Sequence, residues 1–288
     1  MAAVADWDPR IARAILFAER NLESAEVDLS IEALAREACM SPFHFHRLFR
    51  ATLGEPVSAW VRRLRLERAA MLLRHTQTPL VQIAMLCGYA TQAAFTRAFA
   101  RRFAVSPGAW RAAHGLSLWQ QDAPPSEPPQ VTKLGAMRVL WRRHQGDWPG
   151  MAETMAGVCR VFEERGWFRS DTSLVFFIYD EPDVTALEQQ RVDLGLTLPA
   201  DADAAGWDVR EVPAGPAAYV DVDGDYATFE AAAMDFAYRQ FPLLGQQPSS
   251  DQLLAFCPGR QAWSLADDLL RALCQPCPVR IVQPIAPA

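Results

Sequence analysis

A pattern that repeats after fifty residues constrains the first part of this chain more than any other feature. Ser41 opens the first copy and Thr91 the second, and in both a phenylalanine follows four and again eight positions later. A hydroxyl side chain can cap the start of a helix, and apolar residues three or four positions apart share one helical face. Each copy therefore predicts a capped helix with one face committed to a core.

A short apolar segment precedes each capped helix, at residues 31–39 and 80–88. A turn of about three residues separates each segment from the capped helix. Two helices joined by a tight turn, the second with a basic outer stripe, form the helix-turn-helix pattern. The sequence thus predicts an amino-terminal all-α domain that contains this motif twice.

The stretch from Pro56 to His75 predicts one long amphipathic helix between the two motifs. A helix of this length rises roughly 30 Å at 1.5 Å per residue. The helical repeat of DNA is about 34 Å, so two capped helices held this far apart fit successive major grooves. One chain is therefore expected to read two half-sites of double-stranded DNA.

The charge of this region agrees with a nucleic-acid partner. Residues 39–111 contain eleven basic side chains and only two acidic ones, a net charge of +9. Basic side chains that meet phosphates supply most of the affinity for DNA and make it salt-dependent. We expect this role for Arg62, Arg63, Arg65, Arg68, Arg74, Arg101, Arg102 and Arg111.

The second motif carries a signature of many residues at fixed spacing. Its members are Ile83, Ala84, Gly88, Tyr89, Thr91, Phe95, Arg97, Phe99, Phe103, Ser106, Pro107, Trp110 and Arg111. On these residues, the region 8–114 resembles the DNA-binding domain of AraC-type transcription regulators. The resemblance implies promoter DNA as a partner, with RNA polymerase as a further one.

The resemblance also implies which side chains face the bases. In the first capped helix these are Phe43, His46 and Arg47, and in the second they are Gln92, Ala93, Thr96 and Arg97. Arg50, Arg101 and Arg102 extend the same basic stripe and complete the expected DNA-binding set. Because Ala93 cannot donate a hydrogen bond, the second helix is expected to read fewer bases, or a thymine methyl group.

The two parts of the chain differ in charge. Residues 1–116 have a net charge of +5, and residues 117–288 a net charge of −11. Between them, residues 122–130 contain four prolines, a composition that favours an extended linker. We therefore expect a DNA-binding domain at 1–116, a linker at 117–130 and a second domain at 131–288.

Composition indicates a cytoplasmic protein that does not enter a membrane. The sequence has no apolar run near 18 residues, and its acidic start, residues 5–8, is unlike a signal peptide. The six scattered cysteines are read as reduced, mostly buried thiols. A lone pair, Cys274 and Cys277, is weak evidence for metal binding or redox chemistry. We expect no cofactor and no metal.

The acidic part also repeats itself, at a spacing of 78 residues. A strand ends in a Gly-Asp-aromatic turn at 146–148 and again at 224–226, and an amphipathic helix and a further strand follow each turn. Two such units predict an α+β domain with antiparallel strands and helices on one side. The arrangement resembles the duplicated GyrI-like effector-binding domain, and the whole chain is similar to the Rob-like subgroup of AraC-type regulators.

Aromatic side chains are the candidate effector-binding residues of this second domain. Stacking and cation–π attraction suit them to a planar guest, although most aromatic residues in a domain belong to its core. The paired turns single out Trp148 and Tyr226, where ligand contact and core packing are equally expected. The further candidates are Trp141, Tyr179, Trp207 and Tyr219.

The charge of the ligand is left open. GyrI-like domains commonly hold cationic ligands with a glutamate on a late strand, but residues 251–256 contain none. A charged ligand in a pocket that has no carboxylate regains little of the free energy that its desolvation costs. A neutral aromatic ligand is therefore expected at least equally. The main hypothesis is a ligand-responsive transcription regulator without enzyme activity. The alternative is a drug-sequestering or small-molecule-hydrolysing protein with secondary DNA binding.

Overall fold

The computed structural model describes residues 7–22, 27–115, 129–146, 150–181, 183–224, 226–246, 253–257 and 277–286. The chain folds into two compact units. One comprises residues 6–123 and is helical; the other comprises residues 124–288 with residues 1–5 and contains the sheet. Residues 117–128 of the expected linker lie outside the described residues.

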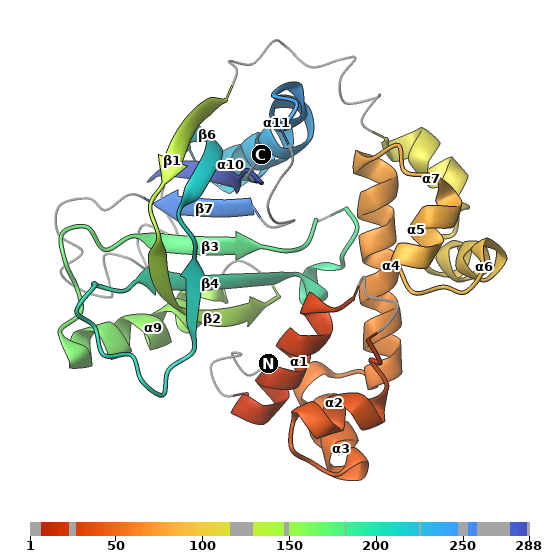
Figure 1. The fold of residues 1–288 in the computed structure, drawn as a ribbon, viewed down its shortest axis with the longest axis horizontal. Helices are drawn as coiled ribbons and strands as arrows, with labels where there is room; N and C mark the ends of the chain where they lie inside the picture. The colour runs from red at the N-terminus through yellow and green to blue at the C-terminus, as the bar shows by residue number, and fades with distance from the viewer. Residues whose placement is uncertain are drawn as a thin grey trace. The chain divides into compact units, whose positions relative to one another are not determined.

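The helical unit consists of short helices arranged around one long helix (Figure 1). They are α1 (Pro9–Arg20), α2 (Ile31–Glu37), α3 (Pro42–Leu53), α4 (Val57–His75), α5 (Leu80–Leu86), α6 (Gln92–Phe103) and α7 (Pro107–His114). The pairs α2–α3 and α5–α6 are the two helix-turn-helix motifs, and α4 connects them. The predicted all-α double helix-turn-helix fold is confirmed.

The two motifs begin and end in the same way. The Ser41 side chain accepts a hydrogen bond from the His44 amide at the start of α3, and Thr91 accepts one from the Ala94 amide at the start of α6. Both helices end at a residue with positive φ, which breaks the helical path. The predicted caps are therefore present in both copies.

One aromatic contact is also repeated after fifty residues. Phe49 of α3 meets Trp60 of α4 edge-on at 5.4 Å, and Phe99 of α6 meets Trp110 of α7 edge-on at 5.9 Å. All four side chains are buried. The second helix of each motif, α3 or α6, is called the recognition helix. Each recognition helix is thus fixed by the same apolar anchor, so its opposite face remains free for a partner.

The second unit is built on one antiparallel sheet of eight strands in the order β1-β6-β8-β7-β3-β4-β2-β5. The strands are β1 (Gln130–Leu134), β2 (Met137–Gln145), β3 (Leu174–Ile178), β4 (Arg191–Thr197), β5 (Val209–Val212), β6 (Gly215–Gly224), β7 (Leu253–Cys257) and β8 (Cys277–Pro284). The helical elements are α9 (Met151–Arg165), α10 (Tyr226–Asp235), α11 (Phe241–Leu243), the 3₁₀ turn η2 (Leu187–Gln189) and the π-helical turn η3 (Phe236–Gln240).

Two short connections force this sheet to curl. Residues 135–136 join β1 to β2, and residues 213–214 join β5 to β6. Since β1 and β6 lie at one end of the strand order and β2 and β5 at the other, these links hold the two ends together. Figure 1 shows β1 and β6 passing across β3 and β4.

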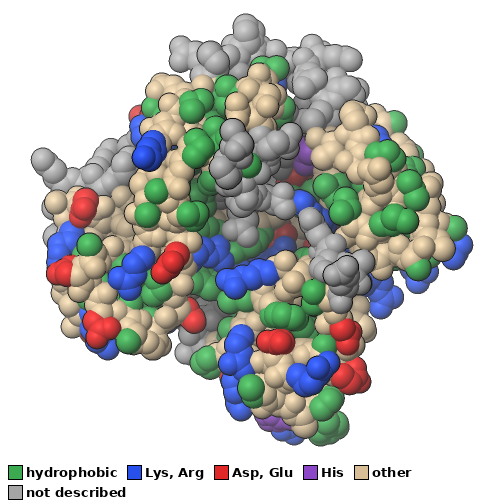
Figure 2. All heavy atoms as spheres, in the orientation of Figure 1, with side chains coloured by type: hydrophobic (Ala, Val, Ile, Leu, Met, Phe, Trp, Pro, Cys, Tyr) green, Lys and Arg blue, Asp and Glu red, His purple; other side chains and the backbone are tan. Residues whose placement is uncertain are grey.

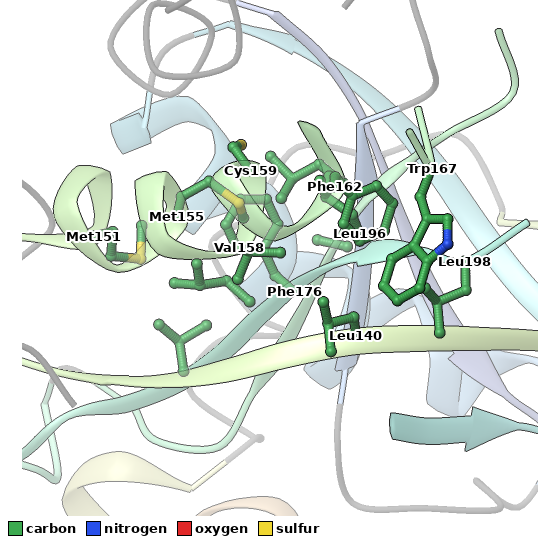
Figure 3. Close-up of a cluster of buried hydrophobic side chains, with 14 of the residues drawn as sticks. Leu140, Met151, Met155, Val158, Cys159, Phe162, Trp167, Phe176, Leu196 and Leu198 are labelled. Carbon is green, nitrogen blue, oxygen red and sulfur yellow. The ribbon is translucent and has the colours of Figure 1, made fainter. Parts of the chain in front are cut away.

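The helices pack on one face of the sheet. Met155, Val158 and Phe162 of α9 lie against Leu140 of β2 and Leu196 of β4 in a fully buried cluster (Figure 3). A second cluster joins Phe236 of η3 and Phe241 of α11 to Ala218 and Ile281 of the sheet. The predicted α+β fold with antiparallel strands and helices on one side is confirmed, while the sequence pattern did not predict β1 and β4.

The described cysteines differ in exposure. Cys87 and Cys159 are buried as expected, whereas Cys39 is exposed in the turn before α3. Burial, with a smaller contribution from Glu163, raises the pKa of the Cys159 thiol to about 12. The thiolate is the reactive form, so this residue has almost none of it near neutral pH.

We therefore expect iodoacetamide at pH 8 to modify Cys39 and leave Cys159 unmodified in the folded protein. Peptide mass spectrometry after a short native reaction measures both residues in one sample. The unfolded protein is the control, because there the Cys159 thiol is no longer buried and both residues should be modified. Equal modification of the two residues in the native sample would contradict the burial of Cys159.

Candidate nucleic-acid interface and effector site

The expected base-facing residues lie on the outer faces of the two recognition helices. On α3, Phe43, Arg47 and Arg50 are exposed and His46 is half-buried. Phe43 stands out because 81% of its surface is accessible, which is unusual for a large apolar side chain. Figure 2 shows histidine and basic side chains gathered at the lower edge of the helical unit, where Figure 1 places α3.

The second recognition helix repeats this arrangement. Arg97 lies at the position that Arg47 has on α3, and both are exposed. Thr96 is half-buried, as is His46 at the matching position. The remaining members of the expected set, Gln92, Ala93, Arg101 and Arg102, are exposed. The two outer faces are therefore equivalent in exposure and differ in chemistry.

Three of the arginines expected to contact DNA phosphates are instead buried or donate hydrogen bonds within the domain. Arg63 and Arg74 are 8% and 4% exposed, so the prediction is wrong for both. Arg111 donates to the carbonyl oxygens of Leu73 and Thr78 at 3.4 and 2.5 Å. Sequence reasoning assigned them by charge alone, because helical spacing does not show which arginine has an internal partner. Arg62 is exposed and keeps its predicted role as a proposal.

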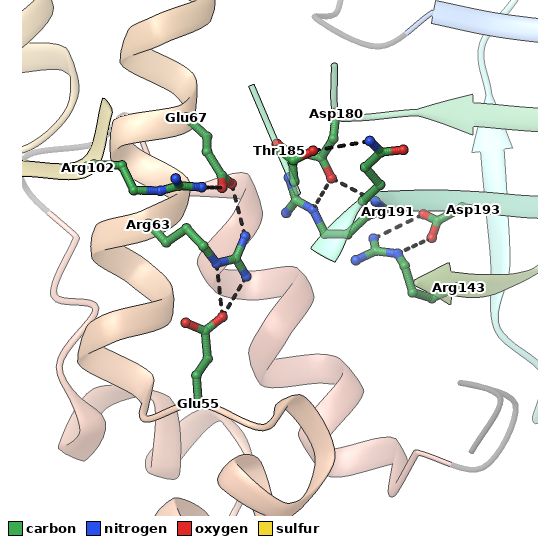
Figure 4. A network of polar contacts seen from close by, with 10 residues as sticks. Glu55, Arg63, Glu67, Arg102, Arg143, Asp180, Thr185, Arg191 and Asp193 are labelled. Carbon is green, nitrogen blue, oxygen red and sulfur yellow. Dashed lines mark hydrogen bonds and ion pairs between the residues drawn. The ribbon is translucent and has the colours of Figure 1, made fainter. Parts of the chain in front are cut away.

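A chain of ion pairs runs along the connecting helix (Figure 4). The Arg63 guanidinium lies 2.6 Å from a Glu55 carboxylate oxygen and 3.0 Å from one of Glu67. Glu67 is 2% exposed and also pairs with Arg102 of α6 at 3.2 Å. Glu55 precedes α4 and follows α3, so these four side chains link the end of one recognition helix to the other through α4.

The sheet unit has a second buried polar group, on the face that the helices leave uncovered. β4 and β2 lie between β3 and β5, so in a flat sheet β3 and β5 would be about 14 Å apart. The guanidinium carbon of Arg210 on β5 is nevertheless 4.2 Å from the centre of the Phe177 ring on β3. This face, which we call the concave face, is therefore curved inward.

Asp193 of β4 lies on the concave face, in the same row as Phe177. Strand register places it opposite Phe177 on one side and opposite Arg143 on the other. Its carboxylate is fully buried and receives hydrogen bonds from Nε and Nη2 of Arg143 (Figure 4). Arg210 Nη2 donates to the same carboxylate at 2.8 Å, and the Tyr179 hydroxyl donates to it as well.

β2 and β4 approach each other closely beside Asp193. Gly195 is paired with Trp141, and a Cβ atom at Gly195 would lie 2.2 Å from the Leu140 carbonyl oxygen. Only glycine fits at this distance. It lets the backbones of the two strands come together beside Asp193.

The structure brings some of the expected effector residues together and separates others. Trp141 and Tyr179 both lie on the concave face around Arg210. Trp207 instead packs against the α9 side of the sheet, apart from Trp141 and Tyr179, and its role at an effector site stays a prediction. Tyr219 contacts Arg280 and Gln130 on neighbouring strands. Trp148 and the side chain of Tyr226 lie outside the described residues.

Sequence reasoning missed Asp193, Arg143 and Arg210. A carboxylate was sought on β7, but the β7 residue that pairs with Phe177 in this row is Leu254. The available signal was the alternation in residues 192–196, where Asp193 interrupts a run of buried apolar residues. A charged residue at a buried strand position indicates either a buried partner that balances its charge or a functional site.

Comparison with known proteins agrees with the assignment of both the helical unit and the sheet unit. The sequence profile of a helix-turn-helix domain matches residues 34–113, and that of the GyrI-like small molecule binding domain matches residues 127–248. This chain joins an AraC-type helix-turn-helix domain to a GyrI-like domain. Among the described residues, no helix combines the length and apolar character needed to cross a membrane, and no group of three metal-ligating side chains occurs.

Similar proteins match the AraC-type domain. The transcriptional regulator YbfP of Bacillus subtilis is 31% identical over 105 residues, which cover 36% of this chain and 35% of YbfP. The right origin-binding protein of Escherichia coli is 36% identical over 83 residues, or 29% of each chain. The chain thus spans about a third of the length of these relatives. The solved C-terminal domain of AraT from Geobacillus stearothermophilus is 27% identical, with a TM-score of 0.37, over 41% of this chain and 95% of that domain.

Proposed function

We propose that this protein is a sequence-specific DNA-binding transcription regulator whose GyrI-like domain senses a small aromatic molecule. The observation that carries the proposal is the pair of matched outer faces on α3 and α6, each anchored by the same aromatic contact. Promoter DNA is the partner, and RNA polymerase is the enzyme through which such a regulator would act.

The geometry of the helical unit supports the reading of two half-sites. The connecting helix α4 has 19 residues, which corresponds to a length of roughly 28 Å. This is close to the spacing of about 34 Å between successive major grooves on one side of a duplex. Exposed Arg47 and Arg97 at equivalent positions are suited to guanine, which arginine binds in a bidentate way.

The effector role rests on the AraC-type domain being joined to a GyrI-like domain with aromatic side chains on its concave face. Trp141, Phe177 and Tyr179 lie around the Arg210 guanidinium there, and the Tyr179 hydroxyl donates to the buried Asp193 carboxylate. Rings of this kind bind planar ligands by stacking, and the polar group orients them. Trp148 and Tyr226 remain proposed ligand contacts on the sequence pattern alone.

We expect Arg97→Ala to weaken operator binding and to relax base preference in one half-site only. A bidentate contact between arginine and guanine is worth about 1 to 3 kcal/mol, or roughly 5- to 150-fold in affinity. The measurement is titration of an operator and of variants changed in one half-site. Equal losses on operator and random duplex would show that Arg97 contacts only phosphate.

Arg101→Ala is the matched control for this prediction. It should lower the affinity for all sequences alike and reduce the salt slope by about one. Arg101 is exposed, whereas the neighbouring Arg102 pairs with Glu67, so its removal would also disturb the fold.

A fragment of residues 1–116 should bind the operator with the specificity of the whole chain. The motifs, the connecting helix and their core all lie in this segment. Circular dichroism and operator titration check the fragment against the full chain. A fragment that is folded but binds without specificity would mean that the GyrI-like domain takes part in reading DNA.

A further inference from the structure

The side chain of Arg210 has unusual surroundings on the concave face. Its guanidinium carbon lies 4.2 Å from the ring centre of Phe177, 4.9 Å from that of Trp141 and 5.9 Å from that of Tyr179. Its Nη2 donates to the Tyr179 hydroxyl at 2.7 Å and to Asp193 at 2.8 Å. We call the three rings and Asp193 the Arg210 cage.

These surroundings are those of a cation-binding site. Aromatic faces attract cations within about 6 Å of the ring centre, and the attraction increases when water is excluded. A buried carboxylate and a phenol hydroxyl add directional hydrogen bonds, which are stronger when one partner is charged. A cationic aromatic ligand would need the same groups, but here an arginine of the chain itself occupies them.

Arg210 is also a second cation on one carboxylate. Asp193 is already bound by both Nε and Nη2 of Arg143, whose side chain is 4% exposed. The side chain of Arg210 is 16% exposed, so it lies nearer to solvent than Arg143 does. An incoming molecule would therefore reach the position of Arg210 more readily than that of Arg143.

We propose that Arg210 is the resident cation of this cage and makes the GyrI-like domain select against cationic aromatic ligands. A tethered guanidinium is present at high effective concentration, so a free cation competes poorly for the same groups. The effector is accordingly an aromatic compound without a positive charge. This inference rests on the proposed ligand-binding role of the domain and specifies its ligand class.

The test compares a cationic and a neutral probe of the same shape on three proteins. The probes are phenylguanidinium and phenylurea, and the proteins are the full-length chain, Arg210→Ala and Arg142→Ala. Arg142 is the matched control because it lies on the same sheet, 5.7 Å from the Trp207 ring, but outside the cage. Calorimetric titration gives the affinities, and circular dichroism reports the fold of each variant.

We expect the affinity of Arg210→Ala for phenylguanidinium to be at least about 10-fold higher than that of either other protein. The probe would then make the cation–π and hydrogen-bond contacts that Arg210 makes in the full-length chain. Phenylurea should show no such gain. Arg210→Gln, which keeps hydrogen-bonding capacity without charge, gives the same comparison if the alanine variant does not fold.

Three results would overturn the inference. Equal binding of phenylguanidinium to all three proteins would mean that Arg210 does not block cations. An equal gain for phenylurea in Arg210→Ala would mean that the substitution only opens space. If neither probe binds any protein while the operator is still bound, the ligand-binding role of the concave face fails together with the inference, and DNA binding stands.

Discussion

Replacing Asp193 by alanine is expected to cost about 3 to 5 kcal/mol of stability in the GyrI-like domain, because a buried ion pair then loses one partner. Asp193 is fully buried and is the shared partner of Arg143 and Arg210. Its removal leaves two guanidinium groups around an empty position. Since domains are stable by only about 5 to 15 kcal/mol, this is a large part of the total.

Urea unfolding followed by tryptophan fluorescence measures the effect, and hydrogen exchange assigns it to the strands of the sheet. Asp201→Ala is the matched control, since the Asp201 side chain is 77% exposed and its ion pair with Arg169 spans 3.5 Å. Such a surface pair contributes about 0 to 1 kcal/mol. Similar losses in the two variants would contradict the central role of Asp193.

The second large effect is expected for Glu67→Ala in the AraC-type domain. Glu67 is buried and joins Arg63 of its own helix to Arg102 of α6. Its loss leaves the 8%-exposed Arg63 with Glu55 as the remaining partner described in this chain of ion pairs. We expect a destabilisation of about 3 kcal/mol, the lower part of the range for breaking a buried pair.

Glu67→Ala should also weaken operator binding beyond the loss of stability, because the ion pair with Arg102 helps to hold α6 against α4. Chemical denaturation and operator titration at a temperature where the variant is fully folded separate the two effects. Glu32→Ala, an exposed change on α2, is the control and should alter neither. Unchanged operator affinity in folded Glu67→Ala would show that packing alone orients α6.

The concave face illustrates what a sequence pattern does not reveal. Trp141 and Tyr179, both aromatic candidates, lie on this face, but Trp207, equally aromatic, lies with the core on the other side of the sheet. Composition assigns no face to a residue in a loop. Which aromatics share a site is decided by strand order and curvature, and these depend on contacts between segments far apart in the chain.

The sequence by itself determined the double helix-turn-helix, its caps and the outward residues, because helical periodicity and capping are local and the motif is repeated. It also determined the α+β character of the GyrI-like domain through two repeated strand and helix units. Only the tertiary structure decided which charges are internal. Arg63 and Arg97 are both arginines on amphipathic helices, yet one is buried beside Glu67 and the other is exposed. The difference comes from the buried partner Glu67 beside Arg63, since desolvation and distance are properties of the folded chain.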